Sequence, residues 1–179
     1  IHWLELFDTS VSNTGTIETT RIAPREMYGI PAQIDTFDPD TVVSVNVKGK
    51  GAMQFEDCLG ICRFAGRLDT LQEVDALQAV TGWDDFTFEE AKEVSLRIVN
   101  RLRAFNLRHG IGPELDRPSP RYGSTPEDGP AKGVGIMPHW DRMVHDYYEQ
   151  MGWDRETSKP LPETLRRLGL EQVATDLWG

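Results

Sequence analysis

Cysteine, long hydrophobic runs and positive charge are all scarce in this chain of 179 residues. Its 2 cysteines give no framework of disulfides, which disfavours the disulfide-rich secreted class and favours a reducing compartment. No apolar run approaches the roughly 20 residues that a membrane-spanning helix needs. The chain starts at Ile1 with no signal-peptide pattern. We therefore expect a cytoplasmic protein without a membrane span, and we interpret the chain as a fragment of a longer protein.

The balance of charge disfavours nucleic acid as a partner. Lysine and arginine number 19 against 29 aspartates and glutamates, which gives a net charge of −10. Phosphate contacts need clustered lysines and arginines, so we expect no nucleic-acid partner. The sequence also lacks a GxGxxG fingerprint and any Ser/His/Asp or Cys/His order that would indicate nucleophilic catalysis. A hydrophobic content of 39% is typical of a globular protein.

Residues 1–50 are predicted to form an irregular N-terminal segment. Ser10–Thr20 is rich in Ser, Thr, Asn and Gly, which is typical of a loop, and prolines interrupt the residues that follow. The alternation of valine with polar residues over Thr41–Val47 predicts a short strand. Lys48–Gly51 then breaks the pattern. A plain loop is favoured there over a phosphate-binding loop, because the Ser/Thr and the spacing of a P-loop are missing.

Residues 51–179 are predicted to form a helical C-terminal domain. The fold class is therefore mostly α: an irregular multi-helix domain with a less regular N-terminal part. Apolar residues at three-residue steps from Leu71 to Val80 predict a helix over 68–80 with one apolar face. Gly82 is placed to end this helix.

A longer helix is predicted to begin after Thr87, which with Glu90 has the spacing of a capping box, and to run to about Arg108. Its predicted buried face consists of Phe88, Ala91, Val94, Ile98, Leu102 and Phe105. Residues 113–135 are rich in Pro and Gly and predict a crossing loop. The remaining predicted helices cover 138–151, with a stop at Gly152, Pro162–Leu168 and Glu171–Leu177.

The segment Asp57–Cys62, with the sequence DCLGIC, is the most informative part of the chain. A carboxylate such as Asp57 can accept paired N–H donors from a heterocycle, and a thiolate can ligate a soft metal. Gly60 lets the backbone approach a bulky cofactor, or bend. The residue types alone leave a plainer alternative open, in which Asp57 is solvated or paired with the nearby Arg63 or Arg67.

Cys58 and Cys62 can be interpreted either as core residues or as metal ligands. Cys58 and Cys62 lie one helical turn apart, but two ligands are too few for a zinc or iron–sulfur site. Buried, inert thiols are favoured on the residues alone, because free cysteine packs like a small hydrophobe. The alternative is a single cysteine that joins ligands from elsewhere.

The order of several segments resembles the C-terminal region of the tungsten-containing aldehyde:ferredoxin oxidoreductase family. Asp57–Cys62 is similar to the second D-x-x-G-(L/I)-C motif of that family. The resemblance continues in the same order through Val80–Trp83, Arg101–Gly110, Asp128–Pro130, Tyr147–Asp154 and Leu165–Leu170. The ordered series covers roughly residues 40–179 and is far more specific than any single motif.

The resemblance implies ligands of two cofactors. Asp57 would accept hydrogen bonds from the N–H edge of a pterin in a tungsten bis-molybdopterin (tungstopterin) cofactor, and Leu59, Gly60 and Ile61 would line that pterin. Cys62 would be the fourth ligand of a 4Fe–4S cluster whose other cysteines lie upstream. Both cofactors would be shared with upstream domains of the same protein, so the fragment alone is expected to be inactive.

The reaction that the resemblance implies is oxidation of an aldehyde, with water, to a carboxylic acid. Two electrons would leave through the cluster to ferredoxin or another electron-transfer subunit. His109 stands where the family pattern has a glutamate, and Ser10–Thr20 does not match the expected histidine-bearing segment. Glu18, which falls near that position, is the candidate for a catalytic, proton-handling residue. Two alternatives stay open: a dearomatising tungsten subunit of the benzoyl-CoA reductase type with an aromatic substrate, and a cofactor-free helical interaction domain with core cysteines.

Overall fold

The computed structural model of the chain describes residues 3–19, 25–62 and 68–179. Within these ranges the regular elements are α-helices and short 3₁₀ helices, with no β-strand. The predicted mostly α fold is therefore confirmed. Arg63 and Arg67, the arginines considered as partners of Asp57, lie outside the described residues.

The N-terminal part contains two α-helices, α1 (Trp3–Ser10) and α2 (Pro39–Lys48), and the 3₁₀ helix η1 (Arg25–Tyr28). The strand predicted over Thr41–Val47 is wrong, because these residues lie within α2. Valine is enriched in strands, but that preference is weak and depends on the surroundings of each residue.

The residues at the start of α2 explain why this segment forms a helix and not a strand. The carboxylate of Asp38 accepts a hydrogen bond from the backbone N–H of Thr41 at 2.8 Å, which is an N-terminal cap. Proline follows at the first helical position, where its missing N–H costs nothing. Val42, Val43 and Asn46 are then buried together at helical spacing, on the face that meets the core.

The main core lies where α7 (Trp140–Met151) packs on α2, which in turn packs on α1. Gly152, with a φ of 69°, ends α7 as predicted. Residues from the first and the second half of the chain meet in this core, whose buried members are Trp3, Leu6, Phe7, Val11, Val42, Val43, Val99, Ile136, Trp140, Met143, Val144, Tyr147, Tyr148, Met151 and Trp153. The division of the chain after residue 50 stays a prediction.

Helices α5 (Thr70–Thr81) and α6 (Phe88–Arg108) follow the predicted boundaries closely. The hydroxyl of Thr87 accepts a hydrogen bond from the backbone N–H of Glu90 at 3.2 Å, as its capping position predicts. Gly82 ends α5 in the left-handed conformation. The apolar face predicted for α5 is only partly correct, since Val80, in its last turn, is 85% exposed.

The buried face of α6 differs from the prediction. Phe88 and Ala91 are buried, but Val94, Ile98 and Leu102 are half-buried and Phe105 is 60% exposed. The interior instead receives polar side chains that find partners there. Arg103 forms a buried ion pair with Asp116 at 2.6 Å, and the side-chain carbonyl of Asn100 accepts a hydrogen bond from the indole N–H of Trp153 at 2.9 Å. Apolar periodicity does not detect partnered polar residues of this kind.

The C-terminal part is built from short helices. The predicted crossing loop contains the 3₁₀ helix η2 (Pro113–Leu115), and η3 (Met137–His139) leads into α7. Helices α8 (Pro162–Arg167) and α9 (Glu171–Trp178) match their predictions and bury a small core of their own.

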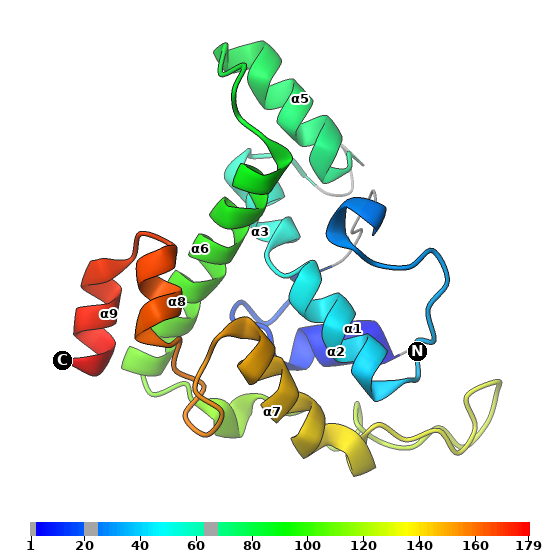
Figure 1. Cartoon of the computed structure of the whole chain (residues 1–179). Coiled ribbons are helices and arrows are strands. Elements are labelled where there is room, and N and C mark those ends of the chain that lie inside the picture. Colours follow the sequence, from blue (N-terminus) through cyan, green and yellow to red (C-terminus); the bar gives the residue numbers. More distant parts are fainter. Residues whose placement is uncertain (1–2, 20–24, 63–67) are drawn as a thin grey trace.

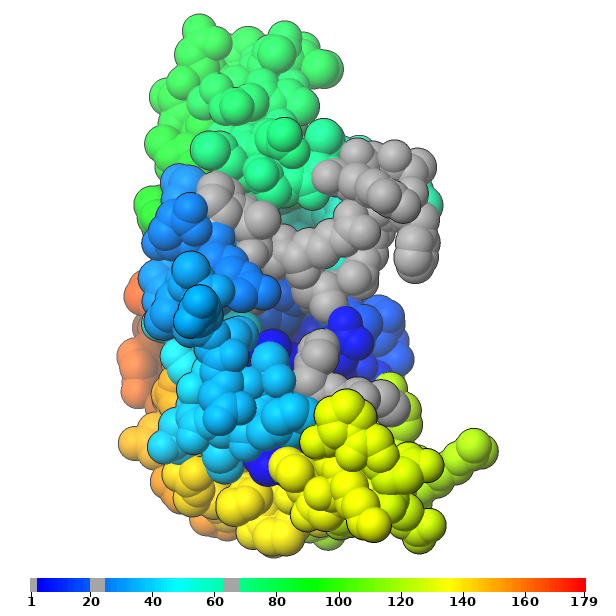
Figure 2. All heavy atoms as spheres, turned by 90° about the vertical axis from the view of Figure 1, so that its right-hand side faces the viewer, coloured from blue at the N-terminus to red at the C-terminus, as the bar shows by residue number. Residues whose placement is uncertain are grey.

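Figure 1 shows how these elements are placed. Helix α5 and the first half of α6 extend away from the body formed by α1, α2 and α7 (Figure 1). The space-filling view agrees, with α5 above the atoms of α2 and of residues 120–136 (Figure 2). None of the helices in the described part of the chain is long and apolar enough to cross a membrane.

Candidate functional site

The D-x-x-G-x-C motif is the C-terminal end of helix α3 (Ala52–Cys58). Gly60 has a φ of 70°, the left-handed conformation that favours glycine. Its N–H donates to the carbonyl of Asp57 at 3.1 Å, and the N–H of Ile61 donates to the carbonyl of Glu56 at 3.4 Å. This pair of bonds is a Schellman helix end. The three-residue spacing between aspartate and glycine is therefore the spacing of a helix end.

The motif leaves the protein core at this helix end. Residues 52–56 are buried, whereas Asp57, Cys58, Gly60 and Cys62 are exposed. Leu59 is partly buried and packs against the small core of Phe55, Val74 and Phe86, where α3 meets α5 and α6. The carboxylate of Asp57 has no hydrogen bond or ion pair with any described residue. The motif thus has one anchored apolar side chain and three exposed groups able to bind a ligand.

Asp57 occupies a position that does not favour its charge. It lies in the last turn of α3, which contains no basic residue. The carbonyl end of a helix carries partial negative charge, so a carboxylate there costs about 0.3–1 kcal/mol. A residue that breaks a local rule without a compensating contact often marks a functional site. Asp57 is therefore a candidate binding residue whose charge adds nothing to the stability of the helix.

Gly60 and Gly51, the two glycines that flank α3, differ in what surrounds them. A Cβ added at Gly60 would meet no described atom within 4 Å, so the protein leaves the outer side of the turn open. A Cβ added at Gly51 would lie 2.7 Å from the carbonyl oxygen of Ser95 on α6. The start of α3 is thus pressed against α6, while no described atom crowds the glycine at its end.

Both thiols are exposed, so the interpretation of Cys58 and Cys62 as buried core residues is wrong. The reason is that α3 leaves the core before its last two residues. Within the described residues, no group of three or more His, Cys, Asp or Glu side chains could hold a metal. A metal centre at Cys62 would therefore take its other ligands from outside this described part.

Glu18 lies in a different environment from the motif. Its side chain is fully buried, and its carboxylate forms an ion pair with the ammonium of Lys50 at 2.9 Å. The carbonyl of Glu18 accepts a hydrogen bond from the N–H of Met53 in the first turn of α3, at 3.3 Å. The structure thus brings Glu18 to the start of α3, not to the exposed motif at its end.

Lys50 also pairs with Asp8 of α1, at 3.0 Å. We refer to Asp8, Glu18, Thr19 and Lys50 as the Lys50 cluster. Sequence reasoning missed Asp8 and Lys50, because Lys50 stands between glycines in what looks like an exposed loop. The two residues are 42 positions apart, and no local pattern indicates that they meet.

Glu73 is a further buried carboxyl group near α3. It lies on α5 and is 2% exposed. Burial, together with the negative charges of Glu56 on α3 and of Asp69, raises the pKa of Glu73 from 4.5 to about 7. Carboxyl groups are therefore crowded where α5 meets the second half of α3.

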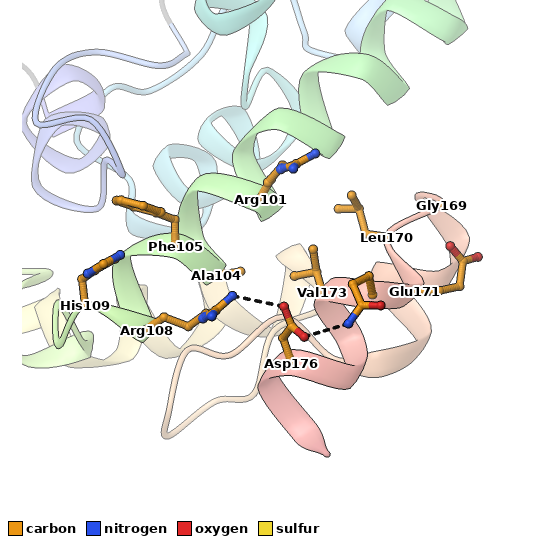
Figure 3. A pocket seen from close by; sticks show the side chains of 11 residues that line it. Arg101, Ala104, Phe105, Arg108, His109, Gly169, Leu170, Glu171, Val173 and Asp176 are labelled. Atoms are coloured by element: carbon orange, nitrogen blue, oxygen red, sulfur yellow. Dashed lines mark hydrogen bonds and ion pairs between the residues drawn. The ribbon is translucent and has the colours of Figure 1, made fainter.

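A groove of about 790 Å³ lies elsewhere, between α6 and α9 (Figure 3). Arg101, Arg108 and His109 contribute cationic or basic groups to its lining. Arg108 is paired with Asp176 at 3.1 Å, and Glu171 supplies a second acid. The positive and negative groups balance, and no motif residue reaches this groove.

Comparison with known proteins identifies the family. The family model described as "Aldehyde ferredoxin oxidoreductase, domains 2 & 3" matches residues 7–170. The chain belongs to the aldehyde ferredoxin oxidoreductase family. The match to this family spans Glu18, Lys50 and the whole Asp57–Cys62 motif.

Individual relatives agree with the family match. The tungsten-containing aldehyde ferredoxin oxidoreductases of Pyrococcus furiosus, Pyrococcus horikoshii and Thermococcus kodakarensis are each 31% identical to the chain over 160 residues. Each alignment covers 87% of this chain and 26% of the relative. The chain thus spans about a quarter of the length of these aldehyde ferredoxin oxidoreductases.

Proposed function

We propose that this chain is the C-terminal part of a tungsten-pterin, iron–sulfur oxidoreductase that oxidises aldehydes to carboxylic acids and passes the electrons to ferredoxin. The observation that carries the proposal is that Asp57 and Cys62 of the motif are exposed and pair with no described residue, in a chain of this family. We also propose that upstream domains complete the enzyme and that it works in the cytoplasm.

The motif suits the cofactors that the family implies. The exposed carboxylate of Asp57 has acceptor oxygens and no described partner, as an N–H edge of a pterin requires. Open space at Gly60 allows a flat ring system to approach the backbone. The exposed thiol of Cys62 is a soft ligand of the kind that iron–sulfur clusters use.

Each motif residue except Cys58 then has a proposed task. Asp57 accepts the pterin N–H groups and orients the ring, and Leu59, Gly60 and Ile61 cover it. Cys62 supplies one thiolate to a 4Fe–4S cluster. When bound, the tungsten cofactor and the cluster supply the redox chemistry, in which aldehyde and water give carboxylic acid, two protons and two electrons for ferredoxin.

The burial of Glu18 argues against direct proton transfer between its carboxylate and a substrate. Its carboxylate is fully buried and already paired with Lys50, so it has no exposed oxygen for a substrate. The names of the relatives favour aldehyde oxidation over the dearomatising reaction of an aromatic thioester.

The proposal is tested on the full-length protein, purified without oxygen. Mass spectrometry of its metals should find about one tungsten and about four irons per chain. Reduction of ferredoxin should depend on added aldehyde. The control reaction contains benzoyl-CoA with a reductant in place of the aldehyde.

Each outcome decides between the hypotheses. Metal with aldehyde-dependent reduction of ferredoxin supports the proposal. If the protein contains the metals but converts benzoyl-CoA and no aldehyde, the substrate is an aromatic thioester, and the aldehyde part of the proposal is wrong. A well-folded full-length protein without tungsten or iron would overturn the proposal in favour of the interaction domain.

A further inference from the structure

The Lys50 cluster is buried and connects three parts of the chain. The ammonium of Lys50 and the carboxylates of Asp8 and Glu18 are each at most 2% exposed. Asp8 belongs to α1, Glu18 and Thr19 follow it along the chain, and Lys50 lies in the turn between α2 and α3. Because the charges are removed from water, each depends on the others for its partners.

Hydrogen bonds complete the cluster around Asp8. Its Oδ2 accepts from the backbone N–H groups of Glu18 at 2.9 Å and of Thr19 at 2.8 Å. Its Oδ1 accepts from the hydroxyl of Thr19 at 2.8 Å and from Lys50. Both carboxylate oxygens of Asp8 thus accept hydrogen bonds, and these bonds fix the segment that contains Glu18 to α1.

The same segment is fixed to α3. The carbonyl of Glu18 accepts from the N–H of Met53, while Lys50 itself precedes α3 by two positions. Between them Gly51 approaches the backbone of Ser95 so closely that no side chain fits. The first turn of α3 is therefore held by ion pairs on one side and by direct contact with α6 on the other.

We propose that Lys50 is a positioning residue that, through Asp8 and Glu18, fixes the start of α3 and thereby the place of the Asp57–Cys62 motif at its end. The inference rests on the proposed function, because it assumes that this motif holds the cofactors. Helix α3 has 7 residues. It is about 10 Å long and rigid over that distance, so a shift at its start reaches the motif.

The cluster is a permanent tether and not a switch. Burial alone would lower the pKa of Lys50, but the nearby carboxylates of Glu18 and Asp8 outweigh it and raise the pKa well above its ordinary range. The ammonium therefore stays charged across the physiological pH range. The Nζ of Lys50 also lies 5.4 Å from the centroid of the Tyr147 ring, which connects the cluster to α7.

The test uses the full-length protein with Lys50→Met. Hydrogen–deuterium exchange of the amides of α3 should become faster by about tenfold or more, since the tether of its first turn is lost. In molecules that still contain iron, the reduction potential and the electron paramagnetic resonance spectrum of the cluster should shift. A residue that only stabilises the fold would not move this spectrum.

The matched control is Arg103→Met. It also removes the cation of a buried ion pair, with Asp116, but near the C-terminal end of α6, about two turns beyond Ser95, which Gly51 contacts. It should leave the exchange of α3 and the spectrum of the cluster unchanged. If Lys50→Met fails to fold, the neutral triple variant Asp8→Asn, Glu18→Gln, Lys50→Met replaces it, because it leaves no unpaired buried charge.

The outcomes separate this inference from the proposed function. Faster exchange in α3 with a shifted spectrum, absent in the control, supports it. Unchanged exchange and spectrum in Lys50→Met, or in the triple variant, would overturn it. A wild-type protein without metal would instead refute the proposed function, and exchange in α3 would still decide whether Lys50 is the tether.

Discussion

The two ends of helix α3 are built in opposite ways. At its start, Lys50 and Gly51 are both buried; Lys50 is ion-paired, and Gly51 is pressed against Ser95 of α6. At its end, Asp57 and Cys62 are exposed, and Asp57 has no partner among the described residues. The two environments lie at the two ends of a helix of only 7 residues. The first end is held by described contacts, and the second exposes a carboxylate and a thiol.

This difference separates residues that stabilise the fold from residues that serve the site. Functional groups must be held in place by a supporting layer of contacts, while their own reactive atoms stay available. In this chain we propose that the start of α3, with the Lys50 cluster, is this supporting layer. The motif itself contributes an unfavourable carboxylate to the helix end and gains nothing in stability from it.

The largest expected effect comes from exchanging each flanking glycine for alanine. Gly51→Ala should lower the free energy of unfolding by about 2–5 kcal/mol, because a positive φ and a clash with Ser95 add up. Gly60→Ala should cost only about 1–2 kcal/mol, since only its positive φ of 70° opposes the change. Urea unfolding of the 179-residue chain measures both. If both variants lose the same free energy of unfolding, the claim that the two ends of α3 are packed differently is wrong.

A smaller effect is expected from Glu73, which crowds the second half of α3. Its pKa is raised from 4.5 to about 7 in the folded protein, so folding favours the protonated form. Its contribution to stability is therefore complete below about pH 4.5 and is lost as the pH rises to about 7. The loss amounts to at most about 3 kcal/mol.

Glu73→Gln should remove this part of the pH dependence. The variant should gain stability over the wild type between about pH 4.5 and 7, as followed by urea unfolding at a series of pH values. Glu89→Gln, which changes an exposed glutamate paired with Lys92, is the control and should leave the pH dependence as it is. If the free energy of unfolding of Glu73→Gln falls with pH as steeply as that of the wild type, groups other than Glu73 cause the pH dependence.

Local signals in the sequence were sufficient for most helices. Thr87, Gly82 and Gly152 mark helix ends through bonds to residues a few positions away, and each prediction made from them is confirmed. The valines of Thr41–Val47 suggested a strand because strand propensity neglects the cap at Asp38 and the core face that the helix meets.

The candidate site was only partly predictable. The glycine of the D-x-x-G-x-C motif indicates a turn, but the exposure of Cys58 and Cys62 depends on where α3 leaves the core. The pairing of Lys50 with Asp8 joins residues 42 positions apart and has no local signal. The roles given to the motif residues came from the ordered resemblance, and they stay predictions until cofactor binding is measured.

The most direct test is the tungsten content of full-length Asp57→Asn, purified without oxygen beside the wild type. The amide puts an N–H₂ donor where the pterin needs an acceptor, so the variant should lose most of its tungsten. The 179-residue chain with the same change should be no less stable, and even gain about 0.3–1 kcal/mol, because a negative charge leaves the helix end. Full tungsten occupancy in Asp57→Asn would contradict the assignment of the motif to the cofactor.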